Sequence, residues 1–200
     1  MRLWGVVALA LLAAGCTTMR ETEPKRTATE EMLISSAADR AVAQVDAKAL
    51  SGKKVFVDAS NYKGLDPEYT IAAVHEALLK GGALLVGDRK SADAVVEMRN
   101  GAQSVDQHEF LIGIPSFSLP IPLTGTALQI PEIALYAKAQ HIGVSKLAVA
   151  AYNAKTGAYD TASGPLYGFS HEIRYTVLLF VKWRHNDFRP SEQGTMGKGP

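Results

Sequence analysis

Apolar residues recur at helical intervals over two stretches of the chain. The first stretch runs from Thr27 to about Ala49, and Thr27 and Glu30 stand at the spacing of a capping box at its start. The second begins at Asp66-Pro67, a good N-cap followed by proline at the first helical position, and ends at Gly81-Gly82. The chain is therefore expected to contain two amphipathic helices. The buried stripe of the second is predicted to be Ile71, Val74 and Leu78.

Alternating and β-branched runs predict strands around these helices. The turn at 153–157 predicts a hairpin, with Gly157 supplying the positive φ that a bulged loop requires. The predicted strands lie at 53–59, 83–86, 91–105, within 132–152, and at 173–183.

This order of elements predicts the fold class and the domain limits. It indicates a single α/β (α+β) domain, with two or so helices packed on a mixed β-sheet and a C-terminal β-hairpin. The domain is expected to occupy residues 29–188, and residues 189–200 are expected to form a disordered tail.

The N-terminus has the layout of a bacterial export signal. Arg2 precedes an apolar run from Leu3 to Leu12, and small residues lead to Cys16, the one cysteine of the chain. The run Leu12-Ala13-Ala14-Gly15-Cys16 resembles the lipobox of bacterial lipoproteins, with the favoured leucine one position early. This resemblance implies that residues 1–15 are removed and that Cys16 carries covalent lipid, including palmitate. Residues 16–28 would then be a polar tether. The residue after the cysteine is Thr17 and not aspartate, which resembles lipoproteins that are sorted to the outer membrane.

Charge and cysteine content narrow the possible partners. The chain has 21 Lys and Arg against 20 Asp and Glu, and removal of Arg2 leaves a formally neutral mature chain. A neutral chain disfavours binding to nucleic acid, and a single cysteine excludes an intrachain disulfide. The membrane, through the lipid anchor, and an envelope protein or a second copy are the partners expected.

Residues 110–131 form an apolar, proline-rich insertion without a charged side chain. Three interpretations remain open: the segment lines the core of its own domain, provides a docking surface for a partner or sister subunit, or enters a membrane as a hairpin like those of the curli channel. The candidate partner-binding residues are Phe110, Leu111, Ile112, Ile114, Phe117, Leu119, Ile121 and Leu123.

The sequence gives little support for a catalytic site or a metal site. Ser51 with Lys54 and the run 155–157 match short motifs of penicillin-recognising enzymes, but the serine precedes a strand and both matches are typical of turns. His75 beside Asp58 could form a base and its orienter, although a packed histidine is the commoner situation. The five histidines lack ligand spacing, so we expect no metal, no cofactor and no enzyme.

The succession of elements resembles one group of envelope lipoproteins. A lipobox, a strand ending at Asp58, a helix ending at Gly81-Gly82, the run 92–96 and a hairpin at 152–157 are similar to those of the curli-secretion-channel and penicillin-binding-protein-activator lipoproteins. The resemblance suggests a sibling family of unknown function, and it implies a scaffold or partner-binding role.

The sequence therefore predicts a periplasm-facing, outer-membrane lipoprotein that acts as a non-enzymatic binding or scaffold module for another envelope component. The alternative is a subunit of a homo-oligomeric outer-membrane export channel. A third possibility is a cryptic hydrolase that uses His75.

Overall fold

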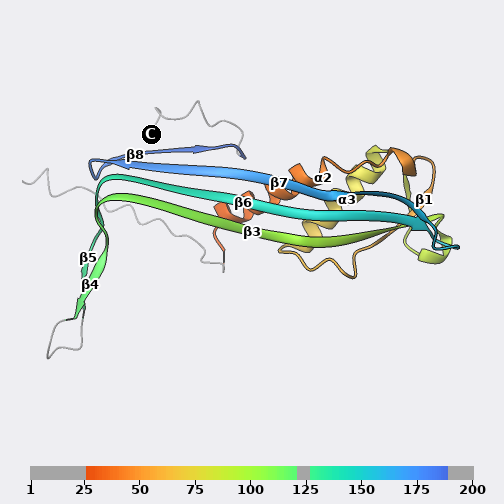
Figure 1. The fold of residues 1–200 in the computed structure, drawn as a ribbon, viewed down its shortest axis with the longest axis horizontal. Helices are drawn as coiled ribbons and strands as arrows, with labels where there is room; N and C mark the ends of the chain where they lie inside the picture. The colour runs from red at the N-terminus through yellow and green to blue at the C-terminus, as the bar shows by residue number, and fades with distance from the viewer. Residues whose placement is uncertain (1–25, 121–126, 189–200) are drawn as a thin grey trace, which may run out of the picture.

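A computed structural model describes residues 26–120 and 127–188. Two helices, α2 (Ala28–Val42) and α3 (Pro67–Lys80), pack against a six-stranded mixed sheet of order β2-β1-β3-β6-β7-β8 (Figure 1). Strands β1 (Lys54–Asp58) and β2 (Leu84–Leu85) are parallel to each other, and β1 is parallel to the start of β3. The expected α+β domain is confirmed.

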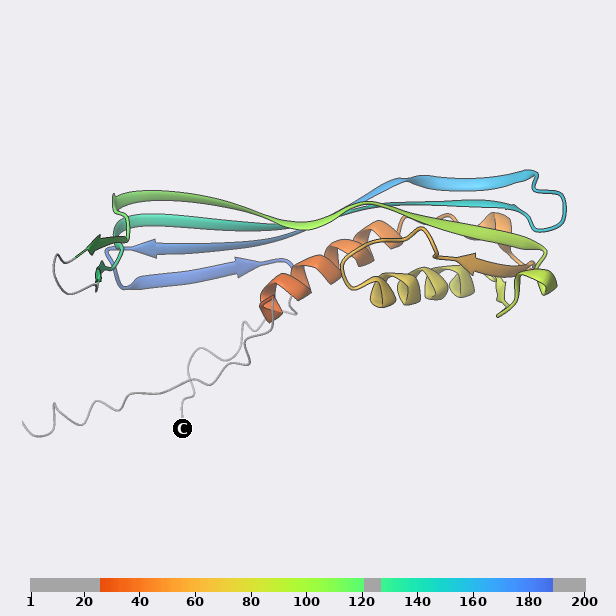
Figure 2. The same cartoon turned by 90° about the horizontal axis from the view of Figure 1, so that it is seen from below.

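Most of the sheet is a long antiparallel ribbon. Its strands are β3 (Ala94–Ile114), β6 (Ile133–Asn153), β7 (Tyr159–Val177) and β8 (Val181–Asn186). The helices cover one face of one half of this ribbon, and the other half extends past the start of α2 (Figure 2). At that far end a separate pair, β4 (Phe117–Pro120) and β5 (Ala127–Ile130), turns away from the ribbon.

Small residues allow α2 to lie close to the ribbon. A Cβ atom at Gly168 would approach the Ala37 carbonyl oxygen within 1.9 Å, and one at Gly143 would approach the Leu33 carbonyl oxygen within 2.4 Å. The hydroxyl of Ser170 donates to that same Leu33 carbonyl over 2.6 Å. Glycine is required here for close approach of helix and sheet, and the apolar face of α2 is thereby buried.

Side chains of α2 and of the residues just after it also protect the open edge of β7. Strand β8 pairs only with residues 172–177, so the carbonyls of Tyr167 and Phe169 have no strand partner among the described residues. Arg40 donates to the Phe169 carbonyl and Gln44 to the Tyr167 carbonyl over 2.6 Å. These bonds satisfy backbone groups that would otherwise be open to pairing with another chain.

Three details of the predicted helices were wrong. The first helix ends at Val42 instead of near Ala49, and a short 3-10 turn, η1 (Lys48–Leu50), follows it. Asp66 has left-handed backbone and does not cap α3, because its carboxylate accepts two hydrogen bonds from Arg26 at 2.9 and 2.7 Å. The capping box of Thr27 and Glu30 is confirmed. The fully buried stripe of α3 is Thr70, Val74 and Leu78, with Ile71 only partly buried.

The strand limits also differ from the prediction. The strand expected at 91–105 continues to Ile114, and that expected at 173–183 is broken by a turn at 178–180. A second 3-10 turn, η2 (Arg89–Ser91), precedes β3. The hairpin at 153–157 is confirmed, with Gly157 at φ 71° and the Asn153 side chain accepting from the Lys155 and Thr156 amides. The tail from residue 189 lies outside the described residues.

Candidate functional site

The end of the ribbon farthest from the hairpin at 153–157 exposes an unusual amount of apolar surface. We call it the ribbon tip and define it as residues 110–120, 127–136 and 177–181, which are the ends of β3, β6, β7 and β8 together with β4 and β5. It lies beyond α2, whose N-terminal end is directed toward it (Figure 2). Its exposed large apolar side chains are Phe110, Ile112, Ile114, Phe117, Leu119, Leu128, Ile133, Leu135, Leu178, Leu179, Phe180 and Val181.

The described candidate residues of the charge-free segment lie at this tip. Phe110, Ile112, Ile114, Phe117 and Leu119 are exposed, and Leu111 is partly buried. The interpretation that the segment lines its own core is therefore wrong for these residues. The strands run past the helices, so no element of the described chain packs against them. Ile121 and Leu123 lie outside the described residues.

The turn between β7 and β8 is the most exposed part of the tip. Leu178 and Leu179 have φ of 49° and 68°, and the side chain of Phe180 is 78% exposed. The Leu178 and Leu179 amides donate to the carbonyls of Leu135 and Ala134 on β6, at 3.0 and 2.9 Å. A left-handed backbone costs a residue other than glycine about 1–2 kcal/mol, so this turn maintains apolar side chains where glycine would be less strained.

The sequence did not reveal this turn as part of a surface. Residues 173–183 are strongly apolar, with charge only at Arg174 and Lys182, and this composition predicts a buried strand. No glycine, asparagine or proline marks the reversal at 178–180. The one signal of an exposed apolar turn was the absence of charge from Tyr175 to Val181. Ordinary core strands also lack charge, so this signal does not distinguish a surface from a core.

Register divides the ribbon behind the tip into two different faces. On the face away from the helices, Phe110, Lys138, Tyr175 and Trp183 form one cross-strand row. Tyr175 and Trp183 stack with ring centroids 5.1 Å apart, and Phe110 meets Tyr136 edge to face at 6.1 Å. This face therefore has an aromatic band about two residues behind the turn.

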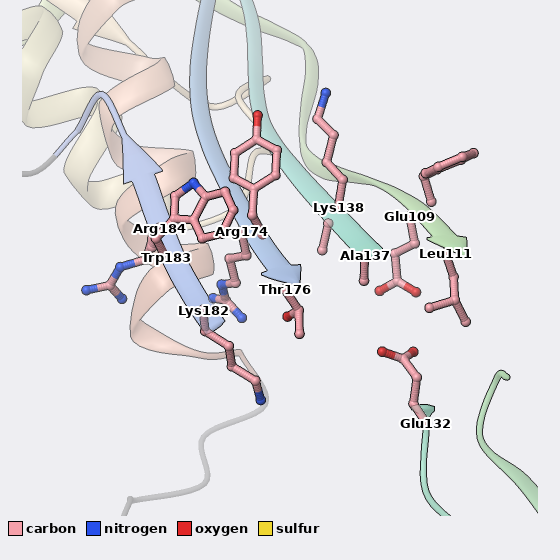
Figure 3. Close-up of a pocket in the computed structure, with 13 residues that line it drawn as sticks. Glu109, Leu111, Glu132, Ala137, Lys138, Arg174, Thr176, Lys182, Trp183 and Arg184 are labelled. Atoms are coloured by element: carbon pink, nitrogen blue, oxygen red, sulfur yellow. The ribbon is translucent and has the colours of Figure 1, made fainter. Parts of the chain in front are cut away.

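The opposite face, which is the helix side, carries charge in a shallow groove beyond the start of α2 (Figure 3). Glu109 and Glu132 point toward one another across it, and Arg174, Lys182 and Arg184 come from β7 and β8. Lys138 lies beside the groove on β6, but its side chain points to the face away from the helices, in the row with Tyr175 and Trp183 (Figure 3).

A buried carboxylate lies where this groove meets α2. Glu172 is 0% exposed, and its Oε2 is 2.8 Å from Arg174 Nη2 and 3.7 Å from His141 Nδ1. Arg184 Nε is 3.9 Å from Oε1. Arg174 and Arg184 are therefore partly neutralised by Glu172, and the cluster joins β6, β7 and β8 at the point where the helix layer stops.

The residues considered for hydrolysis are not assembled into a catalytic site. No hydrogen bond joins His75 on α3 to Asp58 on β1 in the described chain. The Asp58 carboxylate instead accepts from the Ser60 amide over 3.0 Å, and hydrogen bonds from Ser60 hold the pKa of Asp58 below its usual value. Ser51 is placed against Gly82, and Lys155 lies in the hairpin turn.

None of the helices in the described part of the chain has the length and apolar content needed to cross a membrane. Within residues 26–120 and 127–188, no three His, Cys, Asp or Glu side chains are grouped so that they could hold a metal ion.

Comparison with known proteins gives one match. The model of a family of unknown function, DUF6655, matches residues 8–177, from within the N-terminal apolar run to the last residue of β7. No curated protein and no solved structure matches the chain significantly. The resemblance to the curli-channel and activator lipoproteins stays a prediction.

Proposed function

Since the chain belongs to DUF6655, a family of unknown function, we propose from its own residues that it is a lipid-anchored, periplasm-facing lipoprotein of the outer membrane. In this proposal Cys16 holds the chain on the membrane, and the ribbon tip presents a non-enzymatic binding surface to another envelope component. The single observation that carries the binding role is the exposed apolar surface of the tip.

Two physical arguments support a binding role for the tip. Contiguous apolar surface on a monomer is costly in water, and large exposed patches mark sites of contact with protein or membrane. The strained Leu178-Leu179 turn adds a second cost at the same place. Both costs are consistent with a surface that is covered when the protein works.

Photo-crosslinking in intact cells tests this proposal. A benzoylphenylalanine replaces Phe180 at the tip or Tyr159 at the opposite end of β7, which are 78% and 75% exposed. We expect adducts with an envelope component from position 180 and few from position 159. Equal yields from both positions, or none from position 180, would contradict a binding surface at the tip.

A homo-oligomeric assembly, such as an export channel, is the second candidate, and the two ribbon edges favour it. From Ser104 to Ile114 no described strand pairs with the outer edge of β3, and β8 forms the opposite edge. Because strand direction alternates across the ribbon, β8 of one copy would run antiparallel to β3 of the next. The β3 edge carries Asp106 and Glu109, and the β8 edge carries Lys182 and Arg184.

Light scattering of the lipidated protein in mild detergent distinguishes this second candidate. A defined multiple of the monomer mass is expected if the edges pair. The substitution Arg184→Glu should then reduce that mass, and adding Glu109→Arg should restore it by exchanging the two charges. A monomer in the wild-type protein would contradict the assembly.

A further inference from the structure

We propose that the ribbon tip inserts into the surface of a lipid bilayer, and that this bilayer is the membrane that holds Cys16. The inference rests on the proposed lipid anchor and names the envelope component that the tip contacts. Three observations support it: the apolar side chains of the tip, the aromatic and cationic residues behind them, and the position of the N-terminal end of α2, where the described chain begins.

The outermost residues of the tip expose apolar side chains and no charged side chain. The turn Leu178–Phe180 and its neighbour Val181 are exposed, as are Ile112 and Ile114 at the end of β3. In the described part of the segment 110–131 no side chain is charged. Glu109 and Glu132 flank that segment, and their carboxylates are directed toward one another in the groove on the helix side (Figure 3). Such a surface can leave water for an acyl environment without burying an ion.

Residues that favour the membrane interface stand just behind the turn. Trp183 is stacked on Tyr175 two positions from Val181, which corresponds to roughly 7 Å along a strand. Tryptophan and tyrosine concentrate at headgroup depth, and interfacial elements bury their apolar side by about 5–10 Å. The spacing therefore suits shallow insertion.

The charge behind the tip matches an anionic lipid surface. Four cationic side chains stand behind the tip, Arg174, Lys182 and Arg184 on the helix side and Lys138 on the opposite face, against two carboxylates, Glu109 and Glu132. The cations remain in excess when the buried Glu172 is added to the carboxylates. Lys182 and Lys138 have long apolar stems that allow their ammonium groups to reach headgroups while the turn is inserted. A lipid surface satisfies this arrangement without a shaped partner.

The start of the described chain places the anchor and the tip on one membrane. The N-terminal end of α2 is directed toward the tip (Figure 2), and the Leu33 carbonyl accepts from Ser170, seven strand positions before Val177. Those positions correspond to about 23 Å along β7. Residues 16–25 can reach on the order of 30 Å when fully extended, so a lipidated Cys16 and the ribbon tip can contact the same bilayer.

Trp183 provides a natural probe for the experiment. The chain has two tryptophans, and Trp4 leaves with the signal segment, so the mature protein carries Trp183 alone. The lipidated mature protein is reconstituted into vesicles of phosphatidylethanolamine and phosphatidylglycerol with or without brominated acyl chains. Flotation measures anchoring, and Trp183 emission measures contact of the tip with lipid. Phe180→Ser is compared with the matched control Tyr159→Ser, and circular dichroism verifies that both variants are folded.

We expect brominated lipid to quench Trp183 in the wild-type protein and in Tyr159→Ser, with loss of most of that quenching in Phe180→Ser. Vesicles that float with protein whose Trp183 is not quenched would overturn the inference and leave the anchor intact. Equal quenching in all three proteins would also overturn it, because the turn would then not determine insertion. Protein that fails to float would contradict the anchor itself, and the inference with it.

Discussion

The indole ring of Trp183 stacks on the phenol ring of Tyr175, with planes inclined by 19° and centroids 5.1 Å apart. The two residues are direct cross-strand partners on β7 and β8, on the face away from the helices. Such a pair stabilises the short C-terminal hairpin by about 0.5–1.5 kcal/mol beyond its buried area. It thereby supports the exposed turn 178–180, whose Leu178 and Leu179 amides also bond to carbonyls of β6.

Gly168→Ala should destabilise the domain. A Cβ atom would lie 1.9 Å from the Ala37 carbonyl and 2.7 Å from the Ala41 amide nitrogen, so α2 must move away from β7. Overpacking of this kind costs about 1–3 kcal/mol of the free energy of unfolding. Urea denaturation measures the loss. Gly87→Ala is the control, because its Cβ would meet nothing within 4 Å, and equal stability of the two variants would contradict the packing described.

Leu179→Gly should stabilise the protein while weakening contact at the tip. Relief of the left-handed strain should raise the free energy of unfolding by about 1–2 kcal/mol. The greater freedom of glycine in the unfolded chain should offset about 0.5–1 kcal/mol of that gain. We expect a higher free energy of unfolding together with less quenching of Trp183 by brominated lipid. A loss of stability would show that the leucine side chain contributes to packing of the hairpin.

The ion pair between Asp187 and Arg40 should make the free energy of unfolding depend on pH in the acid range. Burial raises the pKa of Asp187, but hydrogen bonds from Arg40 and from His171 outweigh burial and leave the pKa below its usual value. This contribution is present above the unfolded-state pKa of about 3.9, and it is lost as pH falls through the lower folded-state pKa. The wild-type protein should therefore lose more stability than Asp187→Asn between pH 6 and pH 3, as measured by urea denaturation at each pH. Parallel losses would exclude this residue as the cause.

Cys16→Ser should remove acyl labelling and release the domain from membranes. A single interfacial tip without acyl chains binds weakly, so the unlipidated protein is expected in the soluble fraction after washing with salt. Metabolic labelling with palmitate and membrane fractionation provide the readouts. Labelling that persists in the variant would contradict lipidation at this cysteine.

Prediction from sequence succeeded where local chemistry determines the structure. The capping box at Thr27 and the asparagine turn at Asn153 are set by side chains that bond to neighbouring backbone, and both were found. The end of the first helix was missed, because the residues after Val42 bond to β7: the Gln44 side chain donates to the Tyr167 carbonyl and the Asp46 amide to Ser163, both more than a hundred residues away.

Only part of the candidate surface was predicted, because exposure also depends on contacts between residues that are far apart in the sequence. Absence of charge drew attention to Phe110 and Ile112, but exposure depends on which part of the ribbon α2 covers. That placement is set by contacts such as Gly168 beneath Ala37, which no local pattern reveals. The apolar run around Phe180 has the composition of a core strand, and only its place beyond the helix layer makes it surface.

Cysteine accessibility in the intact envelope tests the central claim most directly. The chain has no cysteine besides Cys16, whose thiol would be blocked by lipid, so Phe180→Cys and Tyr159→Cys each introduce one reactive thiol. We predict that a water-soluble maleimide labels position 159 both in opened cells and after detergent extraction, and labels position 180 only after extraction. Equal labelling of both positions before extraction would show that the ribbon tip is uncovered, and would contradict its role as the binding surface.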